Sequence, residues 1–287
     1  LPLSENMKIL KAIRDTDPNI VVNGRLVRSA TGNFGDYVNT GDRPAELLTV
    51  KGDAEAIPTT NESYGYSIHD NSHKSAKFFI QLLANSASRG ANLLMNLGPK
   101  GDGSFDTRDT RILDSIGGWL SQNGQSIYGT ERGQLPIPAW GVTTQKGKLI
   151  YLHVFNWPGD GNLELGGLKN QVSKAYFLTD KGQKSLPLKQ LDATTLNIGL
   201  PPKSPGSPDV VIVLETKGNI EADAARLVAA NIPGNRFLVF DAKVHGKMGF
   251  GDGKTDKYYV TGWKNKADYL SWDLRLLKAG KYKITAK

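Results

Sequence analysis

Hydrophobic positions in the first 130 residues alternate between helical and strand-like spacing. Apolar residues three and four apart predict a helix over residues 4–17, with Ser4 as its cap and Pro18 as its stop. The β-branched run IVV at 20–22 predicts a short buried strand. Residues 23–70 are polar and glycine-rich, which predicts a long loop, and loops of this length inside a domain are often functional.

Two more helices and one more strand are expected after this loop. A helix is predicted from about residue 72 to residue 87, and the run ANLLMNLGP at 91–99 predicts a buried strand. A third helix begins at Asp106 or Thr107 and ends at Gly124. Its apolar residues have 3.6-residue spacing: Ile112, Leu113, Ile116, Trp119 and Leu120. Alternating helices and strands favour parallel strands covered by helices, but two strands are too few to close a sheet or barrel.

From residue 133 the pattern changes to short β-rich runs. KLIYLHVFNW, NQVSKAYFLTD, TTLNIGL and DVVIVLE are separated by Gly, Pro, Asn and Asp, which is typical of an antiparallel sandwich. We expect a sandwich over residues 133–217, a linker at 218–231 and a further β segment at 232–287. The expected fold class is therefore α/β followed by all-β.

Composition and charge narrow the function classes. The 287 residues carry a net charge of +8, and a basic balance raises the hypothesis of nucleic-acid binding. The Lys and Arg residues are scattered without interleaved aromatics, so no nucleic-acid partner is expected. No apolar run approaches the roughly 20 residues that a membrane span needs, so no membrane partner is expected. The absence of cysteine excludes disulfides and thiolate chemistry.

Several polar residues are candidates for chemistry. Arg25 follows the first strand, where parallel α/β folds place active-site groups, although it can equally be a structural partner of Asp36. Glu55 has small apolar neighbours that can raise its pKa, whereas most loop carboxylates are only solvated. Tyr64 and Tyr66 offer flat faces for a sugar ring, or ordinary packing. His69 and His73 are four residues apart but lack the following glutamate of the HExxH motif, so neither a metal nor a cofactor is expected.

Four stretches together resemble one enzyme family. They are NIVVNGR, GDAEAIPTTNESYGY, GANLLMNLGPKGDG and RILDSIGGWLSQNGQSIYGT, in this order. The chain resembles the α-L-fucosidases of glycoside hydrolase family 29, in the later part of the catalytic barrel. The resemblance implies that residues 1–132 are the C-terminal part of a (β/α) barrel and that a β-sandwich follows. It also implies retaining hydrolysis of terminal α-L-fucose from glycans, by a nucleophilic carboxylate and an acid/base carboxylate.

The resemblance also assigns roles to residues. It implies that Glu55 is the acid/base and that Arg25, Tyr64 and Tyr66 bind the substrate, with Asp36 and Glu46 as lesser candidates for the acid. The nucleophilic aspartate of the family lies upstream of Leu1, so the chain is expected to be inactive alone and to have the N-terminal barrel half as a partner.

Three positions depart from the family pattern. Ala54 and Tyr64 stand where the family often has Trp, and Gln125 stands where Glu is common. Ala54 implies that one wall facing the sugar is absent. The competing hypothesis is therefore a non-catalytic carbohydrate-binding or scaffold protein derived from the family.

The tail and the location are also inferred by resemblance. Residues 232–287, with Trp263 and Trp272, resemble the opening strands of a carbohydrate-binding β-sandwich module. The family implies a secreted or periplasmic location.

Overall fold

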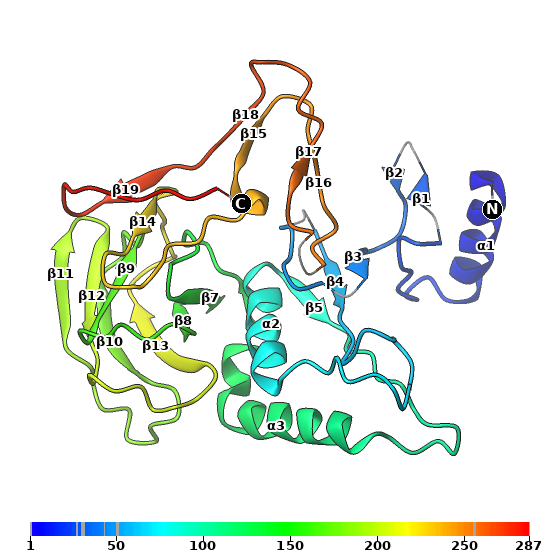
Figure 1. Ribbon diagram of the computed structural model, residues 1–287, viewed down its shortest axis with the longest axis horizontal. Helices are drawn as coiled ribbons and strands as arrows, with labels where there is room; N and C mark the ends of the chain where they lie inside the picture. The colour runs from blue at the N-terminus through cyan, green and yellow to red at the C-terminus, as the bar shows by residue number, and fades with distance from the viewer. Residues whose placement is uncertain are drawn as a thin grey trace. The chain divides into compact units, whose positions relative to one another are not determined.

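The computed structural model describes residues 2–26, 28–29, 32–42, 44–49, 52–254 and 257–286. These residues form two compact units, and each unit is built from more than one stretch of the chain. Unit 1 contains residues 1–121, 239–241 and 246–268; unit 2 contains residues 122–238, 242–245 and 269–287. Unit 1 is mixed α/β and unit 2 is almost entirely β (Figure 1).

Unit 1 is organised around a parallel sheet in the order β3-β4-β5. A parallel bridge from Asn23 to Tyr37 extends this sheet beyond β3. Consecutive strands are therefore neighbours, and Figure 1 shows them side by side. The elements of unit 1 are α1 (Leu3–Thr16), β1 (Arg28–Ser29), β2 (Gly32–Asn33), β3 (Val38–Asp42), β4 (Ala54–Ile57), α2 (Ala76–Ser88), β5 (Ala91–Leu93), α3 (Thr107–Asn123, whose last residues belong to unit 2), η2 (Val239–Asp241), β16 (Gly249–Phe250) and β17 (Val260–Thr261).

One face of the parallel sheet packs against α2. Ala56 of β4 is fully buried with Leu47 and Leu82, and Phe78 packs against them. Side chains alternate along a strand, so Ala54, also buried, faces the helix side together with Ala56. Glu55 and Ile57 therefore lie on the opposite face of the sheet.

The helices follow the predicted periodicity, with different boundaries. Pro2, not Ser4, precedes the first helix and no side chain caps it, while Asp17 is extended before Pro18, as expected for a residue that precedes proline. The second helix begins at Ala76 rather than near 72, because the Ser75 hydroxyl accepts the N–H of Phe78 and caps it there. The third helix runs to Asn123, and a 3₁₀ turn, η1 (Gly124–Ser126), follows it.

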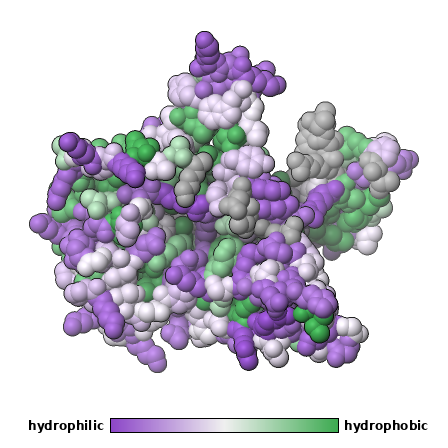
Figure 2. Space-filling view, viewed as in Figure 1, coloured by the Kyte–Doolittle hydropathy of each residue, from purple (hydrophilic) through white to green (hydrophobic). Residues whose placement is uncertain are grey.

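Neither predicted buried strand forms as expected: the second, β5, is limited to Ala91–Leu93 and none of its residues is buried. Residues 20–22 form no strand: Val22 is buried, but the side chain of Val21 is 70% exposed. This segment lies at the edge of the described parallel sheet. Figure 2 shows apolar side chains on the surface of the N-terminal part of unit 1. Met7 and Ile9 of α1 are among the exposed apolar residues.

Unit 2 is built mainly from antiparallel strands. Two antiparallel sheets, ordered β10-β13-β8-β7-β6 and β11-β12-β9, share one core. Leu152 and Ile212 contribute to that core from the first sheet, and Leu163 and Ile198 from the second. The elements of unit 2, besides η1, are β6 (Glu131–Arg132), β7 (Gly141–Lys146), β8 (Leu149–Val154), β9 (Asn162–Gly166), β10 (Val172–Phe177), β11 (Leu188–Asp192), β12 (Thr195–Gly199), β13 (Val210–Thr216), β14 (Arg226–Val228), β15 (Lys243–His245), β18 (Tyr269–Ser271) and β19 (Leu274–Leu276).

The segment 232–287, expected to be a separate β module, is divided between the two units. β14, from the expected linker, pairs in parallel with β19, and β15 pairs with β18, all within unit 2. Residues 246–268 instead join unit 1. The division arises because this segment makes its backbone contacts with earlier parts of the chain, not only with itself.

Candidate active site

The carboxyl ends of the parallel strands bring several predicted residues to one edge of the sheet. Arg25 follows the bridged segment at Asn23, and its guanidinium Nη2 donates to Asp42 Oδ1 at 3.0 Å, at the end of β3. Thr59 and Asn96 form a parallel bridge just beyond β4 and β5. The expected alternative partner of Arg25, Asp36, does not contact it, because Asp36 is held by Arg14. Parallel α/β sheets bind ligands at this edge, and Arg25 lies there.

Glu55 lies on a strand and not in the predicted loop. It is the second residue of β4, in register with Asn39 and Asn92, and its Oε1 accepts the Asn39 amide N–H at 2.8 Å. Glu55 precedes Thr59 by four residues, which is about 13 Å along an extended chain at ~3.3 Å per residue. Glu55 therefore lies toward the amino ends of the strands, on the face of the sheet opposite Ala54 and Ala56.

The two lesser carboxylates lie at opposite ends of β3. Asp36 precedes β3 and accepts the N–H of Val22; this bond and those from Arg14 lower its pKa, so it holds a proton poorly near neutral pH. Glu46 follows the carboxyl end of β3 and is half-buried. The N–H groups of Ala45 and Glu46 both donate to Gly253 O, at 2.8 and 2.9 Å. Of the carboxylates predicted as acids, Glu46 alone lies beyond the carboxyl end of a strand.

The two tyrosines lie on a tight loop after β4. Tyr64 has φ +66°, a left-handed conformation that costs a non-glycine residue about 1–2 kcal/mol. The Asn96 side chain holds the loop, because its Nδ2 donates to Tyr64 O at 2.6 Å and to Thr59 Oγ1 at 3.1 Å. Gly98 is needed here: a Cβ at this position would lie 2.3 Å from the carbonyl carbon of Gly65. Strained backbone of this kind clusters at functional sites.

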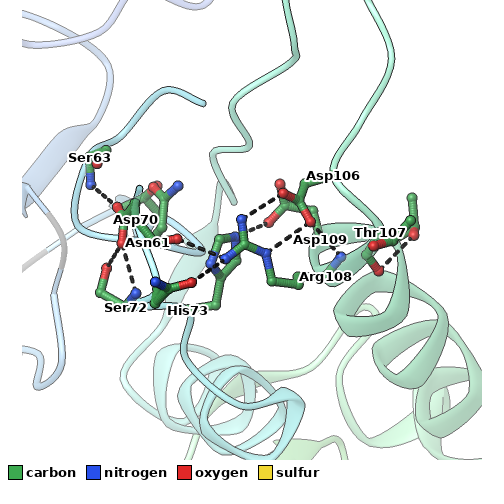
Figure 3. Close-up of polar contacts among 12 residues, drawn as sticks. Asn61, Ser63, Asp70, Ser72, His73, Asp106, Thr107, Arg108 and Asp109 are labelled. Carbon is green, nitrogen blue, oxygen red and sulfur yellow. Dashed lines mark hydrogen bonds and ion pairs between the residues drawn. The ribbon is translucent and has the colours of Figure 1, made fainter. Parts of the chain in front are cut away.

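A polar cluster joins the connections that follow β4 and β5 (Figure 3). Arg108, at the start of α3, donates to the Asp106 carboxylate at 2.7 Å and to the backbone O of Asp70 at 2.8 Å. The Arg108 contact holds the pKa of Asp106 well below its ordinary value. His73 Nε2 lies 3.2 Å from Asp109 Oδ1, and both side chains are at least nine-tenths buried. The cluster fixes the two connections to each other at the carboxyl edge.

The same cluster shapes the loop that carries the tyrosines. Ser63 N donates to Asp70 Oδ2 and Ser72 N donates to Asp70 Oδ1, at 2.8 and 2.7 Å. Hydrogen bonds from these two serines lower the pKa of Asp70 strongly, so it stays ionised. Residues 63–72, which include Tyr64, therefore form a compact turn closed by Asp70.

Some buried polar atoms near this edge have no protein partner within the described residues. The Oδ1 atom of Asn61 and the hydroxyl of Thr60 are both of this kind, and the residues are 3% and 0% exposed. Most buried polar groups form hydrogen bonds, and exceptions gather at ligand sites.

Known proteins match this segment in both sequence and fold. The α-L-fucosidase family model matches residues 3–125. The α-L-fucosidase of Dictyostelium discoideum is 30% identical over 200 residues, which are 65% of this chain and 42% of that protein. Human plasma α-L-fucosidase is 30% identical over 158 residues, or 51% of this chain and 33% of that protein. Residues 3–125 are thus similar in sequence to the α-L-fucosidase family.

Solved fucosidase structures extend the likeness into unit 2. The α-L-fucosidase from Vibrio sp. strain EJY3 has a TM-score of 0.71 and 25% identity, covering 85% of this chain and 44% of that one. The α-L-fucosidase isoenzyme 1 from Paenibacillus thiaminolyticus has a TM-score of 0.67 and 27% identity, covering 74% and 53%. The matched part of this chain spans 42% of the length of the Dictyostelium enzyme and 33% of the length of the human plasma enzyme.

Two departures from the fucosidase pattern have a structural explanation. Ala54 is 2% exposed and lies on the helix side of β4, so its small side chain leaves no gap on the opposite face of the sheet. Gln125 belongs to unit 2, where its Nε2 donates to the Tyr151 hydroxyl at 3.0 Å. Gln125 therefore has a structural role within unit 2.

The fucosidase segment also contains functional candidates that sequence reasoning missed. Asn96, Asp70 and Arg108 hold the carboxyl edge, yet each reads as an ordinary polar residue in a connection. For Asn96 a signal existed, since a polar side chain interrupts an otherwise apolar run. For Gly253 no signal existed, because its contact joins residues about 200 positions apart.

Proposed function

We propose that this chain is the C-terminal portion of a retaining α-L-fucosidase that removes terminal α-L-fucose from glycans. The observation that carries the proposal is the carboxyl edge of the β3-β4-β5 sheet, where Arg25, the Tyr64 loop and Glu46 belong to connections that follow successive strands. The family match over residues 3–125 and the sequential order of the parallel strands both support a (β/α) barrel in the intact protein.

The reaction needs two carboxylates about 5–5.5 Å apart. One attacks the anomeric carbon to form a glycosyl-enzyme, and the other protonates the leaving oxygen and then activates water. We place the nucleophile outside residues 1–287, in the part of the relatives that this chain does not cover. The chain alone is therefore proposed to be inactive, with the remaining barrel half as its partner.

Arg25 and the tyrosines are proposed to hold the fucose. Arg25 has a partly exposed guanidinium with five N–H donors, and its Nη2 uses one of them to bind Asp42. The ring of Tyr66 is partly exposed, and Lys100 Nζ lies 5.8 Å from its centroid. An aromatic face of this kind suits the apolar side of a sugar ring.

Two glutamates remain candidates for the proton donor, and the geometry favours Glu46. Glu55 is the candidate that the family resemblance implies, but it lies toward the amino ends of the strands. Glu46 follows the carboxyl end of β3, on the edge where parallel barrels carry out chemistry. Asp36 is the weakest candidate, because a hydrogen bond from Val22 and its contact with Arg14 favour its ionised form.

The leaving group of the substrate distinguishes these candidates. Loss of a proton donor slows a fucoside with a poor leaving group, such as methyl α-L-fucoside, by about 10²–10⁴-fold. A nitrophenyl fucoside needs little protonation and is slowed far less in its first step. We expect this difference for Glu46→Gln in the intact protein that contains this chain, with Glu55→Gln closer to wild type.

Glu5→Gln is the matched control, because the Glu5 side chain is exposed on α1 and pairs with the exposed Lys8. Substantial hydrolysis of a nitrophenyl fucoside by residues 1–287 alone would refute the placement of the nucleophile. No hydrolysis by the intact protein would refute the enzyme and favour a carbohydrate-binding protein derived from the family.

The location follows from relatives. Those matched here include plasma and tissue α-L-fucosidases, and we propose a secreted or periplasmic location. Among the described residues, no helix is long and apolar enough to cross a membrane.

A further inference from the structure

A hairpin from late in the chain packs against the connection between β3 and β4. Strands β16 and β17 pair antiparallel, and the loop between them carries Gly253. Gly253 O accepts the N–H groups of Ala45 and Glu46, and Pro44 forms an antiparallel bridge with Lys254. Residues 44–46 therefore pair with residues 253–254 of the hairpin through backbone contacts.

This contact is backbone against backbone and leaves no room for a side chain. Gly253 has φ +81°, and a Cβ there would lie 2.2 Å from Glu46 O. On the other side of the loop, a Cβ at Gly41 would lie 2.6 Å from Asp252 O. A separation below 3.0 Å from a backbone atom forces the chain to move, so both glycines are needed for this approach.

A buried ion pair anchors the chain just before the hairpin. Arg89, at the end of α2, is 4% exposed and donates to Asp241 Oδ1 at 2.7 Å and to Thr49 Oγ1 at 2.8 Å. Phe240 packs edge-to-face on Phe250 of β16, with ring centroids 5.6 Å apart. An ion pair and an aromatic contact therefore hold the hairpin within unit 1, in addition to the backbone hydrogen bonds at Gly253.

Residues 44–46 gain their order from this contact. The described residues between β3 and β4 contain no helix or strand, so the segment lacks the repeating hydrogen bonds that usually fix a backbone. Two of its N–H groups instead share the Gly253 carbonyl. Glu46 is one of these two residues, which places a candidate proton donor directly on the hairpin contact.

We propose that the hairpin of residues 246–268 is a positioning element of the fucosidase site, which holds Glu46 at the carboxyl end of β3. The inference rests on the proposed function. It assigns this part of the expected carbohydrate-binding tail to the catalytic unit. Gly253 acts through Glu46 and is a positioning residue, because it does not itself contact the substrate.

The test substitutes Gly253→Ala in the intact protein. The matched control is Gly206→Ala, because Gly206 has φ +88° but an added Cβ there meets nothing within 4 Å. Both variants carry the same backbone strain, and only the first displaces Glu46. We expect Gly253→Ala to lower kcat on methyl α-L-fucoside at least 10-fold, with a much smaller loss on a nitrophenyl fucoside and little change in KM.

Each outcome decides the proposal. A Gly253→Ala enzyme that behaves like Gly206→Ala, or that loses activity equally on both substrates, would overturn it. If Gly253→Ala does not fold, hydrogen exchange in the wild-type protein decides instead: the amides of Ala45 and Glu46 should be protected, and rapid exchange at both overturns the proposal. A wild-type protein without fucosidase activity refutes the proposed function itself, which is a different result.

Discussion

The strained conformation of Tyr64 predicts a measurable coupling with Asn96. Tyr64 has φ +66°, and the left-handed region costs a non-glycine residue about 1–2 kcal/mol. Asn96 forms two hydrogen bonds to this region, and each contributes about 1 kcal/mol net. The two bonds are therefore sufficient to offset the strain, and without them the loop should relax.

Comparing alanine with glycine at position 64 isolates the free-energy cost of the positive φ, because neither residue retains the tyrosine ring. We expect Tyr64→Gly to be more stable than Tyr64→Ala by about 1 kcal/mol. In an Asn96→Ala background the difference should fall below about 0.5 kcal/mol, because the relaxed loop no longer needs a positive φ.

Urea unfolding of the four variants measures this coupling. An equal glycine advantage in both backgrounds would show that Asn96 does not hold the strained conformation. A change in the slope with urea concentration, rather than in the midpoint, would point to an altered denatured state and would also contradict the reasoning.

Three further predictions concern stability. Asp209→Ala should destabilise unit 2 by about 3 kcal/mol in urea unfolding, because it removes the carboxylate partner of the buried His153. Both side chains are fully buried, and His153 Nδ1 lies 2.7 Å from Asp209 Oδ2. A loss below about 1 kcal/mol would contradict this prediction. Asp106→Asn should destabilise the protein at pH 7, and the deficit should shrink as pH falls below about 4, where the unfolded carboxyl takes up its proton; a deficit equal at pH 7 and pH 3 would argue against it. Ser75→Ala should cost about 1 kcal/mol by uncapping α2, whereas Ser75→Asp should keep most of the stability; equal losses in thermal melts would count against the cap.

The helices and the antiparallel strands could be predicted from the sequence because each depends on a local pattern of residues. The run DVVIVLE lies in a strand with five successive buried residues, Val210–Leu214, and such a run has few alternatives. Pro18 stops the first helix wherever that helix begins, since the residue before proline avoids the helical region.

The parallel strands of unit 1 were not accessible in the same way. β3 reads VNTGD and β4 reads AEAI, and both are short and contain polar residues. Glu55 therefore read as a loop carboxylate, although its partner Asn39 lies on the neighbouring strand. Conversely, the apolar run at 20–22 predicted a buried strand where Val21 is exposed.

The tail was misread for a related reason. Its β-rich composition predicted a separate module, but residues 246–268 pack against the connection after β3. A contact between positions about 200 residues apart leaves no periodic trace in a single sequence.

The central claim is that the carboxyl edge of the β3-β4-β5 sheet binds fucose. The most direct test is a crystal structure of the intact protein with a fucose-mimicking iminocyclitol. We expect the inhibitor to lie beyond the carboxyl ends of these strands, with Arg25 and Tyr66 in contact with it and the Glu46 carboxylate facing the leaving-group side. An inhibitor bound instead at the amino ends of the strands beside Asp36, or on unit 2, would contradict it.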